Sequence, residues 1–347
     1  MEGREKVSEV AVIGAGAWGT GLGIVLARNG AHRVRLWAYE AEVCQSIQNH
    51  RENQLFLSGV AVPESVAVTN SLAQVLEGAT VVVGVMPSHH ARALYRQMKP
   101  YVRRQMLFVS ATKGIENDSL QRMTEVIEEV LSEGPDGFRP RLGALSGPSF
   151  AREVVKGDPT AITIASEDDA LARQVQQEFS DPKFRLYRHH DVIGVELGGA
   201  LKNIVAIAAG VVDGLGLGYN TVAALVTRGL AEMTRLVVAC GGQAETMAGL
   251  AGLGDLVLTC TGGLSRNRSV GVELGKGRKL QDVIAGMHGM VAEGVLTTNA
   301  AVGLAQRHGV EMPITEQAHA LLHRGKPPRE AIHELMTRPF TTEVKLY

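Results

Sequence analysis

The sequence predicts two domains, an α/β domain built on a doubly wound parallel sheet and, after it, an all-α domain. Three observations indicate this: a length of 347 residues, short β-branched runs alternating with helical patterns up to about residue 187, and Ala- and Gly-rich helical segments beyond residue 190. Parallel strands need crossover connections, so this alternation favours a sheet covered by helices. We expect one domain over residues 1–190 and a second over residues 191–347.

Seven short apolar runs have the length and β-branched content of buried strands. They cover residues 10–13, 34–37, 66–69, 81–86, 107–111, 142–145 and 161–165. In the second half, apolar periodicity predicts helices over residues 195–212, 222–239, 298–308, 314–323 and 329–336. The first half should therefore form the sheet and the second half a helical domain.

The charges of the chain nearly balance. Its 35 basic and 36 acidic residues give a formal net charge of -1, so the chain has no bulk field to attract nucleic acid or an anionic membrane. Residues 1–6 are charged and lack the apolar stretch of a signal peptide, and the glycines among residues 10–27 suit turns and close packing better than a membrane span. We expect a cytoplasmic chain with no nucleic-acid partner and no membrane span.

The cysteines and histidines do not form a pattern typical of a metal site. Cys44, Cys240 and Cys260 are odd in number and far apart, which fits a reducing compartment. No cluster of acids or cysteines with zinc-ligand spacing accompanies the histidine pairs at residues 89–90 and 189–190. We predict that the chain holds no metal.

A glycine-rich loop follows the first predicted strand and opens a helix. Residues 14–19 read GAGAWG, which has the spacing GxGxxG. In this context the first glycine permits a tight turn, the second lets the backbone approach a pyrophosphate, and the third lets helix and strand pack closely. The loop predicts a Rossmann-type domain that binds NAD or NADP.

The end of the second predicted strand bears on which dinucleotide binds. Glu40 could accept a hydrogen bond from the ribose 2′-hydroxyl of NAD, whereas Arg35 or a neighbouring cation could accommodate the 2′-phosphate of NADP. A solvated acid at a strand end is the alternative for Glu40. The sequence leaves the choice of cofactor open.

Polar residues follow two further strands of the predicted sheet. Ligands of such sheets collect at the carboxyl ends of the strands, which directs Lys113 toward the binding crevice. Residues 146–150, SGPSF, follow another apolar run and could present backbone and hydroxyl groups at the same edge. A solvated loop lysine and a plain turn are the alternatives.

Lys202 stands alone among small and branched apolar residues. Its helical neighbours three and four positions away are apolar, so its counter-charge must come from another segment, and Asp255 is a candidate. An ammonium in such surroundings can polarise a carbonyl and donate the proton that an alkoxide needs after hydride delivery. The alternative is a lysine that extends from the helix to solvent.

A basic, glycine-rich segment spans residues 259–268. It combines flexible backbone with the hydroxyl of Ser265, the guanidinium of Arg266 and the amide of Asn267, and it opens a helix that runs toward residue 274. Arginine and the N–H groups of a helix start both bind phosphate oxygens. We predict a phosphate site here, with an exposed loop capped by Ser265 or Asn267 as the alternative.

Taken together, these motifs closely resemble the soluble NAD(P)-dependent glycerol-3-phosphate dehydrogenases. The resemblance spans nearly the whole chain and rests on GAGAWG at residues 14–19, KGIE at 113–116, SGPS at 146–149, ELGGALKN at 196–203, GD at 254–255 and SRNR at 265–268. It implies reversible hydride exchange between NAD(P)H and dihydroxyacetone phosphate, giving sn-glycerol 3-phosphate for glycerophospholipid synthesis.

The resemblance also implies roles for individual residues. Lys202 would be the catalytic proton donor and acceptor, Lys113 would hold the substrate and reach the cofactor, and Asp255 would orient both lysines. The other substrate-side positions would be Gly147, Ser149, Asn203, Thr259, Ser265, Arg266 and Asn267. The dinucleotide would contact Gly14, Gly16, Ala17, Trp18, Gly19, Tyr39, Lys113, Ala151, Arg266, Val291 and Glu293, and so would be clamped between the domains.

Other functions fit parts of this pattern. A relative of the 6-phosphogluconate or 3-hydroxyacid dehydrogenases could also combine a Rossmann-type half, a helical half and a buried lysine. A non-catalytic nicotinamide-binding regulator would keep the glycine loop but would not need Lys202. A homodimer formed through an apolar face of the helical domain is a further expectation.

Overall fold

Contacts within the chain divide it into two units. The computed structural model describes residues 8–28, 30, 32–287, 290–339 and 342–343, so residues 1–6, used above to predict a cytoplasmic chain, lie outside the described residues. The first unit comprises Met1–Lys113 and Arg122–Val192, and the second comprises Gly114–Gln121 and Ile193–Tyr347. Each unit has its own hydrophobic core, and each is described separately.

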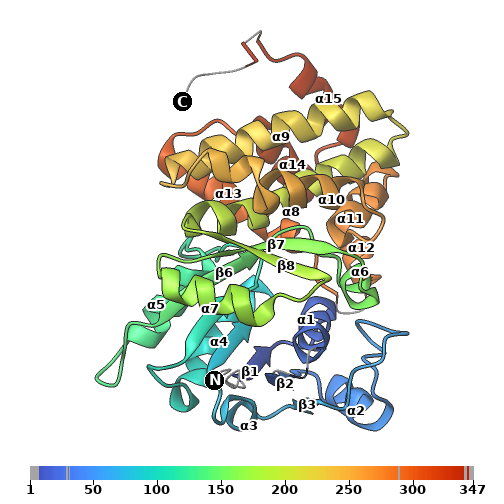
Figure 1. Ribbon diagram of the computed structural model, residues 1–347. Coiled ribbons are helices and arrows are strands. Elements are labelled where there is room, and N and C mark those ends of the chain that lie inside the picture. The colour runs from blue at the N-terminus through green and yellow to red at the C-terminus, as the bar shows by residue number, and fades with distance from the viewer. Residues whose placement is uncertain (1–7, 29, 31, 288–289, 340–341, 344–347) are drawn as a thin grey trace. The chain divides into compact units, whose positions relative to one another are not determined.

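The first unit is built on one eight-stranded sheet (Figure 1), in the order β3-β2-β1-β4-β5-β6-β7-β8. The strands are β1 Ser8–Ile13, β2 His32–Trp37, β3 Val66–Thr69, β4 Val81–Gly84, β5 Leu107–Ser110, β6 Arg141–Ser146, β7 Thr160–Ala165 and β8 Phe184–His189. Each predicted apolar run overlaps one of these strands, although the runs 81–86 and 107–111 extend past the ends of β4 and β5. The order 3-2-1-4-5-6 among the first six strands is that of the dinucleotide-binding sheets, which confirms the predicted doubly wound fold.

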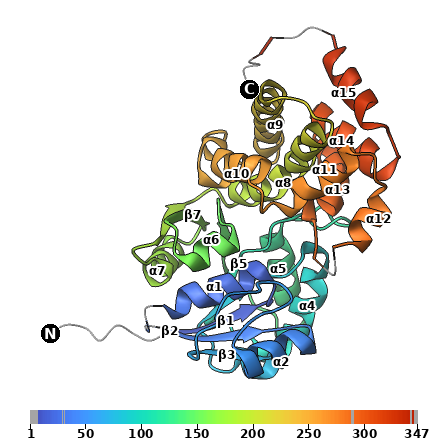
Figure 2. The same cartoon turned by 90° about the vertical axis from the view of Figure 1, so that its right-hand side faces the viewer.

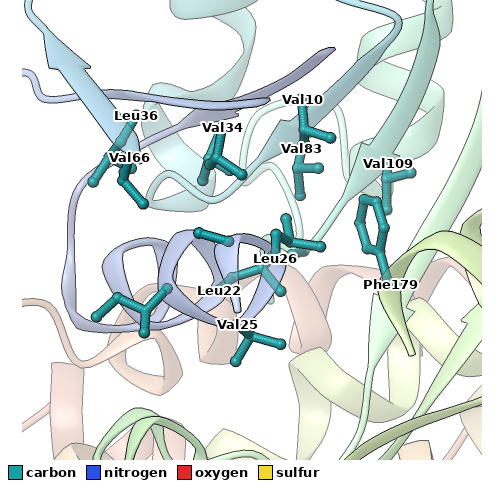
Figure 3. Packing of buried hydrophobic residues seen from close by; sticks show 14 of the residues in the cluster. Val10, Leu22, Val25, Leu26, Val34, Leu36, Val66, Val83, Val109 and Phe179 are labelled. Atoms are coloured by element: carbon teal, nitrogen blue, oxygen red, sulfur yellow. The ribbon is translucent and has the colours of Figure 1, made fainter. Parts of the chain in front are cut away.

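Helices cover both faces of this sheet. Val10 and Val12 of β1 pack with helix α1, Ala17–Ala27, whereas Ala11 and Ile13 face the core formed with α4, Ala91–Met98, and α5, Met123–Ser132. Figure 3 shows Leu22 and Leu26 of α1 beneath the valines of the strands. The remaining helices of this unit are α2 Ala41–His50, α3 Leu72–Leu76, α6 Ala151–Lys156 and α7 Asp169–Phe179.

Two features of the sheet differ from the prediction. Strand β8 was not predicted because its sequence, FRLYRH, is largely polar, and only the alternation of buried Phe184 and Leu186 with exposed residues marks it as a strand. The predicted parallel sheet contains one antiparallel pair, since β7 runs antiparallel to β6. The short helix α6, which joins them, packs on α1, where a Cβ at Gly21 would lie 3.4 Å from the Cβ of Ala151. β7 therefore begins at the same edge of the sheet at which β6 ends.

The second unit is helical, as predicted (Figure 2). Its helices are α8 Val192–Gly214, α9 Tyr219–Ala239, α10 Asp255–Thr261, α11 Arg266–Gly275, α12 Leu280–Ala285, α13 Glu293–His308, α14 Pro313–His323 and α15 Pro328–Met336. Helices α10 and α12 were not predicted, because each is too short to show apolar periodicity. Within the described part of the chain, α8 alone is long and apolar enough to cross a membrane, but 83% of its apolar window is buried inside the protein.

Helices α8 and α11 approach each other at the distance of backbone contact. A Cβ at Gly210 on α8 would lie 2.0 Å from the carbonyl oxygen of Arg268, and a Cβ at Gly271 on α11 would lie 2.0 Å from that of Ile207. Only glycine permits this approach, since any side chain would overlap the facing backbone. The helix that carries Lys202 is thereby fixed against the helix that begins at Arg266.

A short segment from the first half of the sequence belongs to the second unit. Ile115 is buried in the hydrophobic core of the second unit, and a Cβ at Gly303 on α13 would lie 3.1 Å from Leu120. The guanidinium of Arg307 donates a hydrogen bond to the carbonyl of Ser119 at 3.4 Å. These contacts explain why residues 114–121 group with the helices rather than with the sheet.

A buried carboxylate ties α9 to the start of α14. Glu232 accepts hydrogen bonds from the backbone N–H groups of Ile314, at 2.7 Å, and Thr315, at 3.2 Å. These N–H groups belong to the first turn of α14 and have no partner within that helix. Burial raises the pKa of Glu232 to about 7, and the hydrogen bonds from the helix start oppose this rise.

This pKa predicts a pH dependence of stability. Between pH 4.5 and about pH 7 the folded state retains a proton that the unfolded state has released, so the free energy of unfolding falls as pH rises, by up to about 3 kcal/mol. Urea titrations of the wild type and Glu232→Gln should show the wild type losing stability relative to the variant between about pH 5 and about pH 7.5. Parallel pH curves for the two proteins would contradict the prediction.

Candidate functional site

The three glycines of the loop between β1 and α1 differ in what surrounds them. Gly14 has a φ of +122°, and a Cβ there would lie 2.4 Å from the carbonyl oxygen of Val85. A Cβ at Gly19 would lie 1.8 Å from the carbonyl oxygen of Gly14. At Gly16 φ is an ordinary -68°, and an added Cβ would meet no described atom within 4 Å. The fold requires the first and third glycines, and the second leaves open space at the start of a helix.

This open space fits a dinucleotide phosphate. Gly16 is the N-cap residue of α1, so the first N–H groups of that helix lie beside the space, and no side chain caps them. Helix N-termini of this kind bind phosphate groups through N–H donors and the helix dipole. Ala17 and Trp18 form the first turn of α1, and Ala151 of α6 packs against the same helix.

Tyr39 and Glu40 follow the end of β2, whereas Arg35 lies within that strand. The side chain of Tyr39 is 79% exposed, and Glu40 is the N-cap residue of α2. Arg35 instead forms an ion pair with Glu9 at 3.2 Å and donates to the carbonyl of Glu77. Glu9 lies near the amino end of β1, so this ion pair directs the Arg35 guanidinium away from the carboxyl ends of the strands, where ligands of such sheets bind.

Lys113 and the SGPS segment converge on one carbonyl of the first unit. The ammonium of Lys113 donates to the carbonyl oxygen of Gly147 at 3.1 Å, and the hydroxyl of Ser149 donates to the same oxygen at 3.0 Å. Gly147 has a φ of +145°, and a Cβ there would lie 2.9 Å from Ile162. The ends of the parallel strands β5 and β6 bring these residues together.

Lys202 and Asp255 form a buried ion pair in the second unit. The side chain of Lys202 is 7% exposed and that of Asp255 1%, and the ammonium donates to Oδ1 of Asp255 at 2.5 Å. The ammonium also donates to the hydroxyl of Thr259 at 2.7 Å, while that hydroxyl donates to the carbonyl of Asp255 at 2.6 Å. Asp255 is thus the counter-charge predicted for Lys202, and the alternative of a lysine that extends into solvent is wrong.

A close approach of backbones brings these residues together. Gly198 lies one helical turn before Lys202, and a Cβ there would lie 2.8 Å from the carbonyl oxygen of Ala251. Ala251 belongs to the π-helical turn Leu250–Gly254, which leads directly into α10 and Asp255. The small residue on α8 therefore lets the segment that carries the carboxylate reach the lysine.

An amide network joins the residue after Lys202 to the residue after Arg266. Asn267 donates through Nδ2 to Oδ1 of Asn203 at 2.9 Å and accepts from the backbone N–H of Gly294 at 2.9 Å. These three residues are buried and belong to α11, α8 and α13. The network places Lys202 and the start of α11 next to each other.

The start of α11 holds the other residues of the predicted phosphate segment. Ser265 is buried, and its hydroxyl caps the helix by accepting from the N–H of Arg268 at 3.2 Å. Arg266 is the first residue of the helix, is exposed, and interacts electrostatically with Glu293 at the start of α13. Val291 precedes Glu293 in a loop and is partly buried. Capping by Ser265 agrees with the alternative that this segment is a loop capped by Ser265. The cap still leaves Arg266 as the first residue of the helix, where its guanidinium can bind a phosphate together with the helix N–H groups.

Two buried polar residues of the first unit were missed in the sequence analysis. Asn53 and Thr20 are at most 1% exposed and both contact the carbonyl of Ala15 in the glycine loop. Asn53 lies 38 positions from Ala15 in a polar loop that shows no motif, so the sequence carries no signal for this contact.

Comparison with known proteins identifies relatives over nearly the whole chain. The family model for the NAD-dependent glycerol-3-phosphate dehydrogenase N-terminus matches residues 9–172, and that for the C-terminus matches residues 191–333. A glycerol-3-phosphate dehydrogenase (NAD(P)+) of Koribacter versatilis is 69% identical over 340 residues, covering 98% of this chain and 100% of the relative. One from Acidobacterium capsulatum is 55% identical over 336 residues, covering 96% and 99%.

A solved structure leads to the same family. The crystal structure of glycerol-3-phosphate dehydrogenase from Coxiella burnetii superposes with a TM-score of 0.91 at 40% identity, covering 96% of this chain and 99% of the other. Because the family models and these relatives span almost the full length, this chain belongs to the NAD-dependent glycerol-3-phosphate dehydrogenase family.

Proposed function

We propose that this protein is an NAD(P)-dependent oxidoreductase that interconverts dihydroxyacetone phosphate and sn-glycerol 3-phosphate, supplying glycerophospholipid synthesis. The observation that carries the proposal is the buried Lys202–Asp255 pair beside the start of α11, joined to it by the hydrogen bond between Asn203 and Asn267. This arrangement combines a proton donor with a phosphate-binding helix start. The names of the relatives support the same reaction.

The first unit binds the dinucleotide. Its pyrophosphate lies in the open space at Gly16, against the N–H groups of α1, with Gly14, Ala17, Trp18, Gly19, Tyr39 and Ala151 around it. When bound, the dinucleotide supplies or accepts the hydride. Lys113, held by the carbonyl of Gly147 near Ser149, contacts both substrate and cofactor.

The second unit binds the triose phosphate and supplies the proton donor. Lys202 hydrogen-bonds the carbonyl oxygen of the substrate and donates a proton to it as the alkoxide forms. Asp255 holds the ammonium in place and Thr259 restricts its direction. In the reverse reaction Lys202 takes the proton back from the hydroxyl.

The substrate phosphate binds at the start of α11. The guanidinium of Arg266 and the N–H groups of the first helical turn supply its donors, with Ser265, Asn267 and Asn203 fixing the geometry of the turn. Glu293, which interacts electrostatically with Arg266, and Val291 contact the dinucleotide.

We further propose that the protein acts in the cytoplasm as a homodimer. The near-zero net charge gives little electrostatic repulsion between copies. Leu217, just before α9, and Tyr219, its first residue, are 36% and 92% exposed, and we propose them as part of the contact face. The molecular mass in dilute solution tests the dimer, and a monomer mass would rule it out.

The reaction predicts a strong preference for a phosphorylated ketone. Purified protein should oxidise NADH or NADPH with dihydroxyacetone phosphate, with a kcat/KM at least about a hundredfold higher than with unphosphorylated dihydroxyacetone, because only the former binds Arg266 and the helix start. Steady-state assays that follow the nicotinamide absorbance measure this ratio. Equal values for both substrates would refute the proposed phosphate site.

Removing the buried ion pair should abolish turnover but not cofactor binding. The double variant Lys202→Met/Asp255→Asn avoids the buried unpaired carboxylate that a single substitution of Lys202 would leave. We expect kcat to fall at least about a hundredfold while the Kd for NADH, from fluorescence titration, changes less than about twofold. Retained turnover in this variant would place the proton donor on a different group, whereas a non-catalytic regulator would show no turnover even in the wild type.

Alanine at two glycines of the loop should affect different properties of the protein. Gly19→Ala should lower the free energy of unfolding by about 3 kcal/mol, because its methyl group would overlap the carbonyl of Gly14. Gly16→Ala should lower it by less than about 1 kcal/mol but weaken NADH binding about tenfold or more, because its methyl group enters the phosphate space. Urea unfolding and NADH titration measure both, and unchanged NADH affinity in Gly16→Ala would place the phosphate elsewhere.

A further inference from the structure

The side chain of Asn53 holds one carbonyl of the glycine loop. Its Nδ2 donates to the carbonyl oxygen of Ala15 at 2.8 Å and to the hydroxyl of Thr20 at 2.9 Å. Its Oδ1 accepts from the backbone N–H of Phe56 at 3.1 Å. The hydroxyl of Thr20 also donates to the carbonyl of Ala15, at 3.3 Å. The carbonyl is therefore held from two sides.

Burial allows the Asn53 side chain only one orientation. Asn53 is 0% exposed, Thr20 1% and Ala15 2%, so water cannot replace a lost partner. Both N–H groups and the oxygen of the Asn53 amide are used by these three contacts. A rotated amide would point its oxygen at the carbonyl of Ala15 and leave buried donors unpaired. The amide thus has one satisfied orientation.

The orientation of the Ala15 carbonyl fixes the next N–H group. In a trans peptide the C=O and N–H bonds point in opposite directions. Because the Ala15 carbonyl points to Asn53, the N–H of Gly16 points away from Asn53. Gly16 is also the residue at which an added Cβ would meet open space. The N–H is therefore presented on the side opposite the buried amide, beside the N-terminus of α1.

We infer that Asn53 is a positioning residue for the dinucleotide, which fixes the peptide between Ala15 and Gly16 so that its N–H can donate to a pyrophosphate oxygen. The inference rests on the proposed binding of NAD(P) at the glycine loop. It assigns a role in cofactor binding to the loop between α2 and β3, which no motif in the sequence indicates. Asn53 itself touches neither substrate nor cofactor.

The test compares two variants of this loop. Asn53→Asp keeps the size of the side chain but replaces the amide donor with an oxygen that repels the carbonyl of Ala15. Ser46→Ala is the matched control, because Ser46 donates to the carbonyl of Glu52 at 2.7 Å and accepts from the N–H of Gln54 at 3.4 Å. The control loosens the backbone on both sides of Asn53 without touching the glycine loop.

We expect Asn53→Asp to raise the Kd and the KM for NADH about tenfold, the effect of losing a buried hydrogen bond, while kcat at saturating NADH and the KM for dihydroxyacetone phosphate stay within about twofold. Ser46→Ala should leave all four values within about twofold. Unchanged NADH affinity in Asn53→Asp, or an equal loss of affinity in Ser46→Ala, would overturn the inference.

A second variant covers the case in which Asn53→Asp does not fold. Thr20→Val removes the hydroxyl that donates to the Ala15 carbonyl beside the Asn53 amide, so it should also weaken NADH binding. Wild-type affinity in this variant would count against the inference. Direct NADH titration separates this test from the proposed reaction. Wild-type protein that binds NADH but does not reduce dihydroxyacetone phosphate would refute the reaction, and the ratio of NADH Kd values would still decide the role of Asn53.

Discussion

The second unit depends on the buried ion pair between Lys202 and Asp255, because its neighbouring helices pack so that these two charges meet. Two charges removed from water destabilise a fold unless they meet with good geometry and further hydrogen bonds. Here the apolar residues of α8, the close approach at Gly198 and the hydroxyl of Thr259 supply that geometry. The same surroundings that make the pair costly to bury hold the ammonium in one position, as the proposed role of Lys202 as proton donor requires.

Both units use glycine to bring backbones together at the sites of interest. In the first unit the third glycine of the loop lets α1 begin against β1, and in the second Gly210 and Gly271 let α8 and α11 meet. Contact between backbones leaves little freedom for one helix to shift along the other. Main-chain geometry thus positions the residues of the proposed ligand sites. The side chains of Asn53 and Asn267 add hydrogen bonds that hold neighbouring groups in place.

Much of the fold could be predicted because apolar periodicity and glycine spacing are local signals. The strands of the sheet, the long helices and the glycine loop follow from them, and so does the isolation of Lys202 in α8. The polar strand β8, the reversal at β7 and the short helix α10 depend on which neighbours cover them, so no local pattern marks them. The direction of Arg35 and the contact of Asn53 with Ala15 depend on partners distant in sequence, which a single sequence does not reveal.

The segment Gly114–Gln121 makes the chain pass between the units three times rather than once. A fragment that starts at residue 191 would lack Ile115 and Leu120, and part of its apolar interior would be open to water. The two halves are therefore poor candidates for separate expression or for exchange with the halves of another enzyme. A chimera would retain an intact interior only if this eight-residue insertion travelled with the helices it completes.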